Sequence, residues 1–121
     1  MSSANRTLTD HKINECNEAL TITVCDDVGP GNAHHVYRID GYGGTCHISF
    51  QNGAIGEVGV NGITNEALLA VVADRLRCFQ TGPYSCRENA LALTKIEEAM
   101  QWLHHRTRVR MQRGVEGTMK V

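Results

Sequence analysis

The stretch from Cys86 to Arg113 is predicted to form one long helix, and no other feature constrains the fold as strongly. Ser85 and Glu88 stand at the spacing of a capping box, in which the serine accepts a backbone N–H and the glutamate reaches back. Gly114 is the residue type that commonly follows the end of a helix. About 28 residues at 1.5 Å each span about 42 Å, which is too long for a compact chain of 121 residues.

The apolar seam of this helix covers only its first part. Four apolar residues recur there at spacings of three and four: Leu93, Ile96, Met100 and Leu103. Beyond them, Val109 and Met111 are the only apolar side chains before the helix ends. Because an isolated helix end gains little stability by itself, we expect this part to pack on a second subunit, and the chain to form a homo-oligomer.

The rest of the chain predicts an α+β fold in a single domain, with a β-rich half at 1–62 and a helical hairpin at 63–121. A shorter helix is expected over Glu66–Phe79, with Thr64 as its N-cap and the breaker Thr81-Gly82-Pro83 after it. The first 62 residues hold nine of the twelve glycines. They predict a small antiparallel sheet, with an Asn52-Gly53 hairpin turn. The candidate strands are Ala19–Cys25, Val36–Asp40, Thr45–Phe50 and Ile55–Val60.

Composition and charge narrow the class of protein. Hydrophobic residues make up 41% and charged residues 21%, as in soluble globular domains. No apolar run approaches the ~20 residues of a membrane span, and neither a signal peptide nor a membrane partner is expected. The five cysteines are scattered and odd in number, which favours reduced cytosolic thiols. Residues 103–121 carry five basic groups against one acidic group, so a local anion site is expected there. A nucleic-acid-binding helix is the weaker interpretation, because the net charge is only −1.

Catalytic and metal-binding motifs are missing from the sequence. The pairs His34-His35, His104-His105 and Cys46-His47 are sequence neighbours, whose side chains point in different directions. Zinc sites require other spacings, and no cofactor-binding glycine motif precedes a helix. No cofactor and no metal are therefore predicted, and an enzyme is disfavoured.

One segment resembles a known family. Cys86–Arg106 reads C-R-E-N-A-L-A-L-T-K-I-E-E-A-M-Q-W-L-x-x-R, and R-G-V-E-G-T follows at Arg113–Thr118. The wider segment Cys78–Thr118, about a third of the chain, resembles the helical-hairpin domain of phage proteins that sequester cyclic nucleotide signals. One family with this domain blocks CBASS immunity and another blocks Thoeris immunity. The β-rich half in front favours the first type of Thoeris anti-defence protein.

The resemblance implies a homohexameric sponge in the cytoplasm of an infected bacterium. Its ligand would be glycocyclic ADP-ribose made by TIR-domain enzymes, held without cleavage. The pocket residues of the family match Phe79, Asn89 and Arg106, and Arg110 is one helical turn beyond as a candidate second cation. Relatives also bind cyclic trinucleotides at separate pockets, so cyclic di- and trinucleotides are secondary candidates. This chain has Thr81 where a lysine is the candidate trinucleotide contact.

The residues themselves suggest a role for each contact and one constraint. Phe79 can stack on adenine, Asn89 can bind a base edge or ribose hydroxyls, and Arg106 can grip a pyrophosphate. The alternatives are a core phenylalanine, a solvated asparagine and an arginine that only favours the helix dipole. Asn89 and Arg106 are about 25 Å apart along one helix. One small ligand that contacts both therefore needs a pocket between two chains. The rival function is an enzyme that hydrolyses the cyclic signal.

Overall fold

A computed structural model describes residues 5–121, which divide into two compact units. The β unit comprises the described residues through Gly53 together with Val60–Ile63, and the helical unit comprises Ala54–Gly59 and Thr64–Val121. A sheet in the first part of the chain and helices in the second confirm the predicted α+β class.

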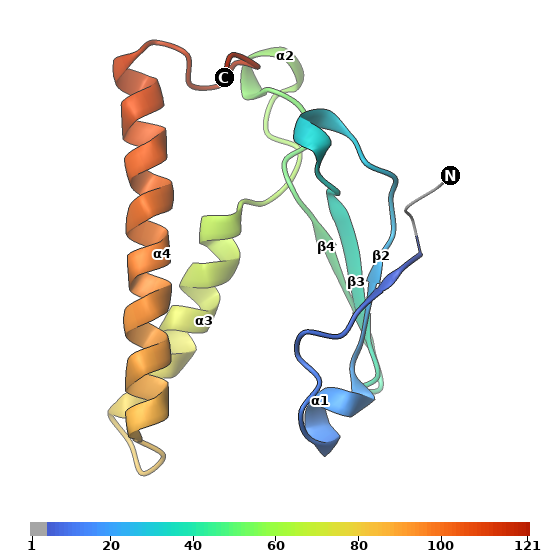
Figure 1. The fold of residues 1–121 in the computed structure, drawn as a ribbon, viewed down its shortest axis with the longest axis vertical. Coiled ribbons are helices and arrows are strands. Elements are labelled where there is room, and N and C mark those ends of the chain that lie inside the picture. The colour runs from blue at the N-terminus through green and yellow to red at the C-terminus, as the bar shows by residue number, and fades with distance from the viewer. Residues whose placement is uncertain (1–4) are drawn as a thin grey trace. The chain divides into compact units, whose positions relative to one another are not determined.

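The β unit contains a four-stranded antiparallel sheet with the strand order β1-β2-β3-β4 (Figure 1). The strands are β1 (Thr7–Leu8), β2 (Thr21–Val24), β3 (Val36–Asp40) and β4 (Thr45–Ser49). The last three confirm predicted strands. The sequence did not predict β1, nor the short helix α1 (Glu15–Ala19), whose N-cap Asn14 accepts from the Asn17 backbone N–H. A 3-10 turn, η1 (Pro30–Asn32), lies in the predicted loop between β2 and β3.

The register of the sheet separates an apolar face from a polar face. Ile22 lies opposite Ile39, which lies opposite Cys46, while Val24 lies opposite Tyr37. Opposed residues share a face of an antiparallel pair, so these side chains gather on one side. Val24 is completely buried.

The polar face carries a small hydrogen-bonded network on β3 and β4. The Asp40 carboxylate accepts from the Thr45 hydroxyl at 2.6 Å and from the Arg38 guanidinium at 2.7 Å. These two hydrogen bonds hold the pKa of Asp40 below its ordinary value. The network is half-exposed, so it orients the strands more than it stabilises them.

The expected strand Ile55–Val60 is wrong, because the structure has a short helix there, α2 (Ile55–Val58). The Asn61 side chain closes the stretch from Asn52 to Asn61, which contains α2, into a loop, so no hairpin forms. Asn61 Oδ1 accepts from the Asn52 backbone N–H at 2.8 Å, and its Nδ2 donates to the Asn52 carbonyl at 2.7 Å. The chain then returns beside β4 through a parallel bridge between Phe50 and Ile63. The predicted Asn52-Gly53 hairpin is therefore also wrong.

The helical unit is built on α3 (Asn65–Gln80) and α4 (Arg87–Gln112), which pack against each other (Figure 1). Thr64 is the N-cap of α3, as predicted, and its hydroxyl accepts from the Ala67 N–H at 3.1 Å. Ala73 is fully buried in this unit. The predicted seam of α4 is half-buried at Leu93, Ile96, Met100 and Leu103.

The predicted Ser85–Glu88 capping box is wrong, because the Ser85 backbone N–H donates to the Gly82 carbonyl and a different residue caps α4. The N-cap is Cys86, whose Sγ accepts from the Asn89 N–H at 3.4 Å, so the prediction of Ser85 was wrong. Gln80 fixes the position of Cys86, because its amide donates to the Cys86 carbonyl and accepts from the Cys86 N–H, both at 3.1 Å. At the other end, Gly114 adopts a φ of +70°, which confirms it as the residue that ends the helix.

Candidate functional site

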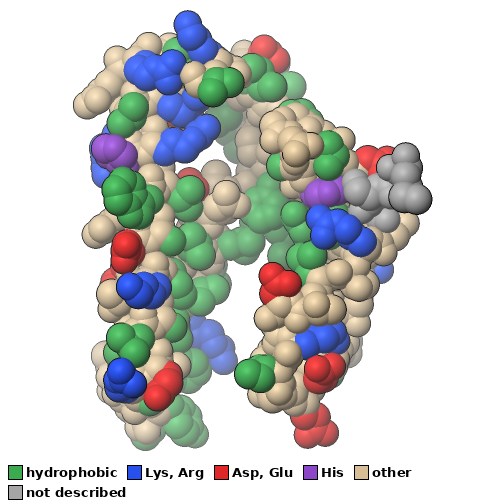
Figure 2. Space-filling view, in the orientation of Figure 1, with side chains coloured by type: hydrophobic (Ala, Val, Ile, Leu, Met, Phe, Trp, Pro, Cys, Tyr) green, Lys and Arg blue, Asp and Glu red, His purple; other side chains and the backbone are tan. Residues whose placement is uncertain are grey.

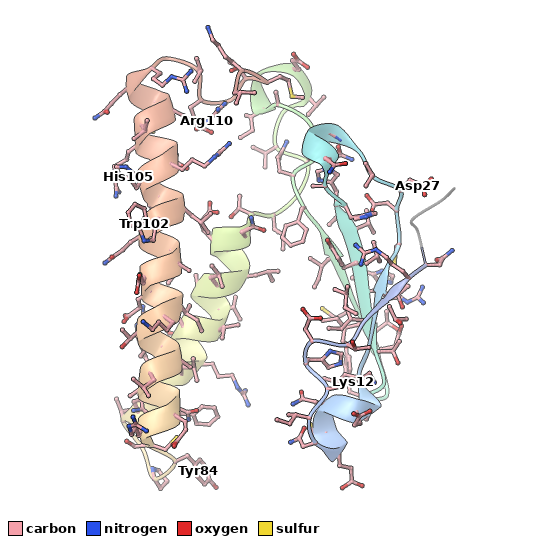
Figure 3. The ribbon with its side chains drawn as sticks, viewed as in Figure 1. Lys12, Asp27, Tyr84, Trp102, His105 and Arg110 are labelled. Carbon is pink, nitrogen blue, oxygen red and sulfur yellow. The ribbon has the colours of Figure 1, made fainter. Side chains whose placement is uncertain are left out.

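The turn that joins α3 to α4 carries an aromatic and cationic cluster. Phe79 is half-buried in the last turn of α3. Its ring meets Tyr84 edge to face, with centroids 6.2 Å apart at 73°, and Tyr84 projects from the turn in Figure 3. The Arg75 guanidinium carbon lies 4.9 Å from the Phe79 centroid, within cation–π range. Phe79 therefore contacts both a second aromatic ring and a cation.

Arg75 and Tyr84 are neighbours of the predicted site that the sequence analysis missed. Arg75 precedes Phe79 by four residues in the same helix, so their side chains share a face. That spacing is visible in the sequence and could have been used. The approach of Tyr84 depends on how the turn folds, which no local pattern signals.

Asn89 belongs to the same end of the helical unit. It is half-buried in the first turn of α4, and its backbone N–H donates to Cys86 Sγ. A side chain at this position can offer a donor and an acceptor beside the helix N-terminus, where the helix dipole favours anions. The structure therefore places Phe79 and Asn89 at the turn end of the hairpin.

Arg106 lies near the opposite end of α4 and is exposed. No carboxylate within residues 5–121 forms an ion pair with it. Seventeen residues of continuous helix separate it from Asn89, which corresponds to about 25 Å. The structure does not bring Arg106 to the Phe79 and Asn89 end of the same chain.

Arg110 has a different environment from Arg106. Its side chain is buried, with 8% of the residue exposed. The guanidinium donates to the carbonyls of Lys120, Val115 and Thr118 at 2.6, 3.0 and 3.1 Å. The direct ligand contact expected of Arg110 stays a prediction.

The end of α4 is a basic surface. Figure 2 shows lysine and arginine side chains gathered over this end of the helix. The exposed cations of the region are Arg106, Arg108, Arg113 and Lys120. A surface of this kind attracts anions from solution and raises their rate of encounter.

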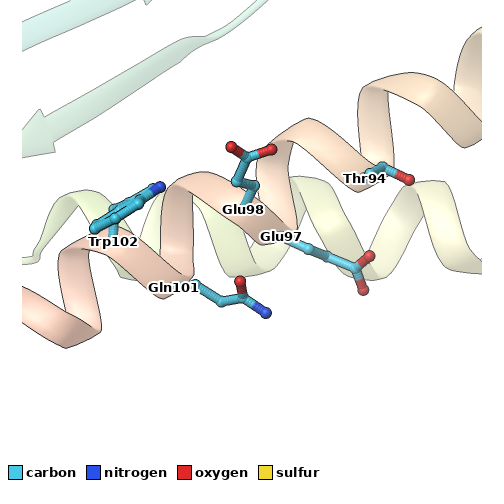
Figure 4. A pocket seen from close by; sticks show the side chains of 5 residues that line it. All are labelled: Thr94, Glu97, Glu98, Gln101 and Trp102. Carbon is cyan, nitrogen blue, oxygen red and sulfur yellow. The ribbon is translucent and has the colours of Figure 1, made fainter.

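A depression of about 450 Å³ lies on the outer side of α4 (Figure 4), lined by Thr94, Glu97, Glu98, Gln101 and Trp102. Trp102 is 66% exposed and meets His105 edge to face. Figure 3 labels both residues, which project from the same side of α4. Two glutamates in the lining disfavour a phosphate-bearing ligand at this place.

The described residues offer neither a metal site nor a helix able to span a membrane. Within residues 5–121, no group of three or more histidine, cysteine, aspartate or glutamate side chains is placed to hold a metal ion. Over the same residues, none of the helices combines the length and the apolar character that crossing a bilayer requires.

A family model described as "Acb2/Tad1, hairpin domain" matches residues 44–108, which is more than half of the chain. The chain belongs to the Acb2/Tad1 hairpin-domain family. The matched segment contains α3 and most of α4, with Phe79, Asn89 and Arg106. Arg110 and the tail after it lie outside the match.

A curated relative agrees with this membership. Thoeris anti-defense 1 of Bacillus phage SBSphiJ7 is 50% identical over 88 residues, which cover 73% of this chain. The same alignment covers 62% of the relative, so the chain spans less than two thirds of the length of the protein it matches. The resemblance to Thoeris anti-defence proteins drawn from the Cys86–Arg106 motif is thereby confirmed.

Proposed function

We propose that this chain is a phage anti-defence protein that binds and sequesters cyclic ADP-ribose-type immune signals. The proposed ligand is glycocyclic ADP-ribose made by TIR-domain enzymes in the cytoplasm of the infected bacterium. The ligand is held and not cleaved, so the immune effector never receives it. The family membership and the likeness to Thoeris anti-defense 1 support the anti-defence role.

The observation that carries the proposal is the separation of the candidate site residues on one hairpin. Phe79 and Asn89 stand at the turn end, whereas Arg106 stands near the far end of α4. A small cyclic dinucleotide-like ligand cannot bridge about 25 Å. The pocket therefore forms where the turn end of one chain meets the basic end of another.

The chemistry of the ligand fits the two halves of such a pocket. Adenine stacks on an aromatic ring, and Phe79, which contacts Tyr84, offers such a ring at the turn. Ribose hydroxyls and base edges match the paired donor and acceptor of Asn89. The pyrophosphate requires a planar cationic fork, which an exposed arginine such as Arg106, with no ion-paired carboxylate among residues 5–121, can supply.

Exposed apolar side chains on the helical unit support the oligomer. Tyr84 is 72% exposed, Val71 68% and Trp102 66%. Burial of such side chains against another chain removes apolar area from water, which favours association. The proposed assembly is a homohexamer, in line with the family resemblance, and secondary ligands are cyclic di- and trinucleotides.

The test is titration calorimetry with glycocyclic ADP-ribose, followed by heating and chromatography of the released ligand. We expect about one ligand per chain with a Kd near 1 nM, or about −12 kcal/mol, and ligand recovered unchanged. Recovery of a cleaved product identifies the rival function, a hydrolase of the cyclic signal. Native mass spectrometry of the same sample reports the subunit number, and a monomer that still binds tightly contradicts the two-chain pocket.

A further inference from the structure

We propose that Arg110 is a positioning residue, which folds the segment 115–121 against the end of α4 and holds it there beside Arg106. The proposal rests on the proposed function, since it assigns a role within the same ligand site. It replaces direct ligand contact by Arg110 with an indirect role.

Three hydrogen bonds and one ion pair with the tail occupy most of the guanidinium of Arg110. A guanidinium has five N–H groups. Nη1 donates to the Lys120 carbonyl at 2.6 Å, and Nη2 donates to the Val115 and Thr118 carbonyls at 3.0 and 3.1 Å. Nε lies 3.3 Å from a carboxylate oxygen of Glu116. Three of the five N–H groups therefore donate to carbonyls of the tail, and Nε is ion-paired with a carboxylate of the same segment.

This arrangement leaves no fork for a phosphate. Bidentate recognition of a phosphate requires two parallel N–H groups on one guanidinium. Both N–H groups of Nη2 and one of Nη1 are hydrogen-bonded to the tail, Nε is paired with Glu116, and the residue is 8% exposed. A ligand would have to displace the folded tail before Arg110 could grip it. Arg106 meets neither obstacle, because it is exposed.

The tail is also held from a second side within the helical unit. The Gly117 carbonyl accepts from the Gly56 backbone N–H of α2 at 2.8 Å. A Cβ at Gly56 would come within 2.9 Å of the same oxygen, so only glycine permits this approach. Gly114 and Gly117 adopt φ values of +70° and +80°, which let the chain reverse twice in a short distance.

The consequence for the site concerns the charge around Arg106. Arg106 precedes Arg110 by four residues on α4, so the two side chains share a face of the helix. Glu116 belongs to the tail, and its ion pair with Arg110 holds its carboxylate at the Arg110 guanidinium. When Arg110 is replaced, the Glu116 carboxylate loses its partner, and the freed tail lets it pair with Arg106 in competition with an anionic ligand.

The experiment compares Arg110→Lys with Arg106→Lys in the full-length protein. A lysine at position 110 keeps the charge but cannot reach three carbonyls and a carboxylate together. Hydrogen exchange of the backbone amides of Thr118 and Lys120 is measured without ligand, because both donate within the folded tail, and exchange of the Val115 amide, which donates to the Arg110 carbonyl, reports the junction with α4. We expect at least tenfold faster exchange of these amides in R110K, and no change in R106K.

Ligand binding by the same two variants gives the second readout. We expect R106K to bind the ligand more weakly while its tail stays ordered. We expect R110K to bind about three- to thirtyfold more weakly, and its tail to be released. The double variant R110K/E116Q is expected to regain part of this loss, since it removes the competing carboxylate. If R110K fails to fold, Gly56→Ala tests the tail from its other side.

Two outcomes overturn the inference. Unchanged exchange in R110K shows that Arg110 does not hold the tail. Loss of ligand affinity in R110K with normal tail protection assigns Arg110 a direct contact. If the wild-type protein binds no glycocyclic ADP-ribose, the proposed function fails, and the exchange data still decide whether Arg110 holds the tail.

Discussion

The two ends of the helical unit are built in different ways. At the turn end, Gln80 and Cys86 are six residues apart, and Cys86 and Asn89 are three apart, so nearby residues hold one another. At the far end, Arg110 binds carbonyls five, eight and ten residues away, and Gly56 of α2 binds the tail. The turn end uses only contacts between near neighbours in sequence, whereas the tail end also needs α2, which comes from a distant part of the chain.

The largest effect is expected from the proposed cation of the far end. Arg106→Ala should weaken binding of glycocyclic ADP-ribose about 100-fold, because a charge-assisted hydrogen bond to phosphate is worth about 2–3 kcal/mol. Calorimetry measures the change, and Arg108→Ala is the matched control, since residue 108 points to another side of α4. Equal losses in both variants would mean that the basic surface acts only through its summed charge.

The second effect tests the turn end of the proposed pocket. Phe79→Leu keeps an apolar side chain but removes the stacking surface, which is worth about 1–3 kcal/mol per base. We expect the affinity for glycocyclic ADP-ribose to fall at least about fivefold. Native mass spectrometry should show that the oligomer is unchanged. Tyr84→Phe keeps the ring that contacts Phe79 and should bind as the wild type does. Unchanged affinity in F79L would show that Phe79 packs within the protein and does not stack on the ligand.

One substitution applied at both ends sharpens the structural comparison. Gly56→Ala places a Cβ within 2.9 Å of the Gly117 carbonyl, whereas Gly82→Ala in the turn meets nothing nearer than 3.9 Å. We expect G56A to cost about 1–2 kcal/mol of stability and to speed exchange of the tail amides. G82A should change stability by less than about 0.5 kcal/mol. Thermal unfolding compares them, and a harmless G56A would contradict the close approach of α2 and the tail.

The smallest effect concerns the cap of α4. Serine is a stronger N-cap than most residues, and sulfur is a weak acceptor. Cys86→Ser should therefore raise the free energy of unfolding by about 0.5 kcal/mol. Cys78→Ser, at an exposed position inside α3, should give no gain. A loss of stability in C86S would indicate that the thiol at this position packs in a way that a hydroxyl cannot replace.

Local patterns predicted the elements in which neighbouring residues cooperate. The Thr64 cap, the long helix that ends before Gly114, and the strand Val36–Asp40 were all predictable, because each depends on a few consecutive residues. The prediction of a strand at Ile55–Val60 was wrong, because the conformation of this segment depends on contacts between residues on either side of it. The side chain of Asn61 closes the loop onto Asn52, and no local pattern contains that contact.

The sequence by itself determined the hairpin, its family and the candidates Phe79, Asn89 and Arg106, because helix periodicity and a specific motif are properties of consecutive residues. Only the tertiary structure decided the environment of each arginine. Arg106 and Arg110 look equivalent in the run of basic residues, yet one is exposed and the other is buried under the tail. That difference arises because the chain folds back after Gly114, and backbone carbonyls, which carry no sequence signal, take up the guanidinium of Arg110.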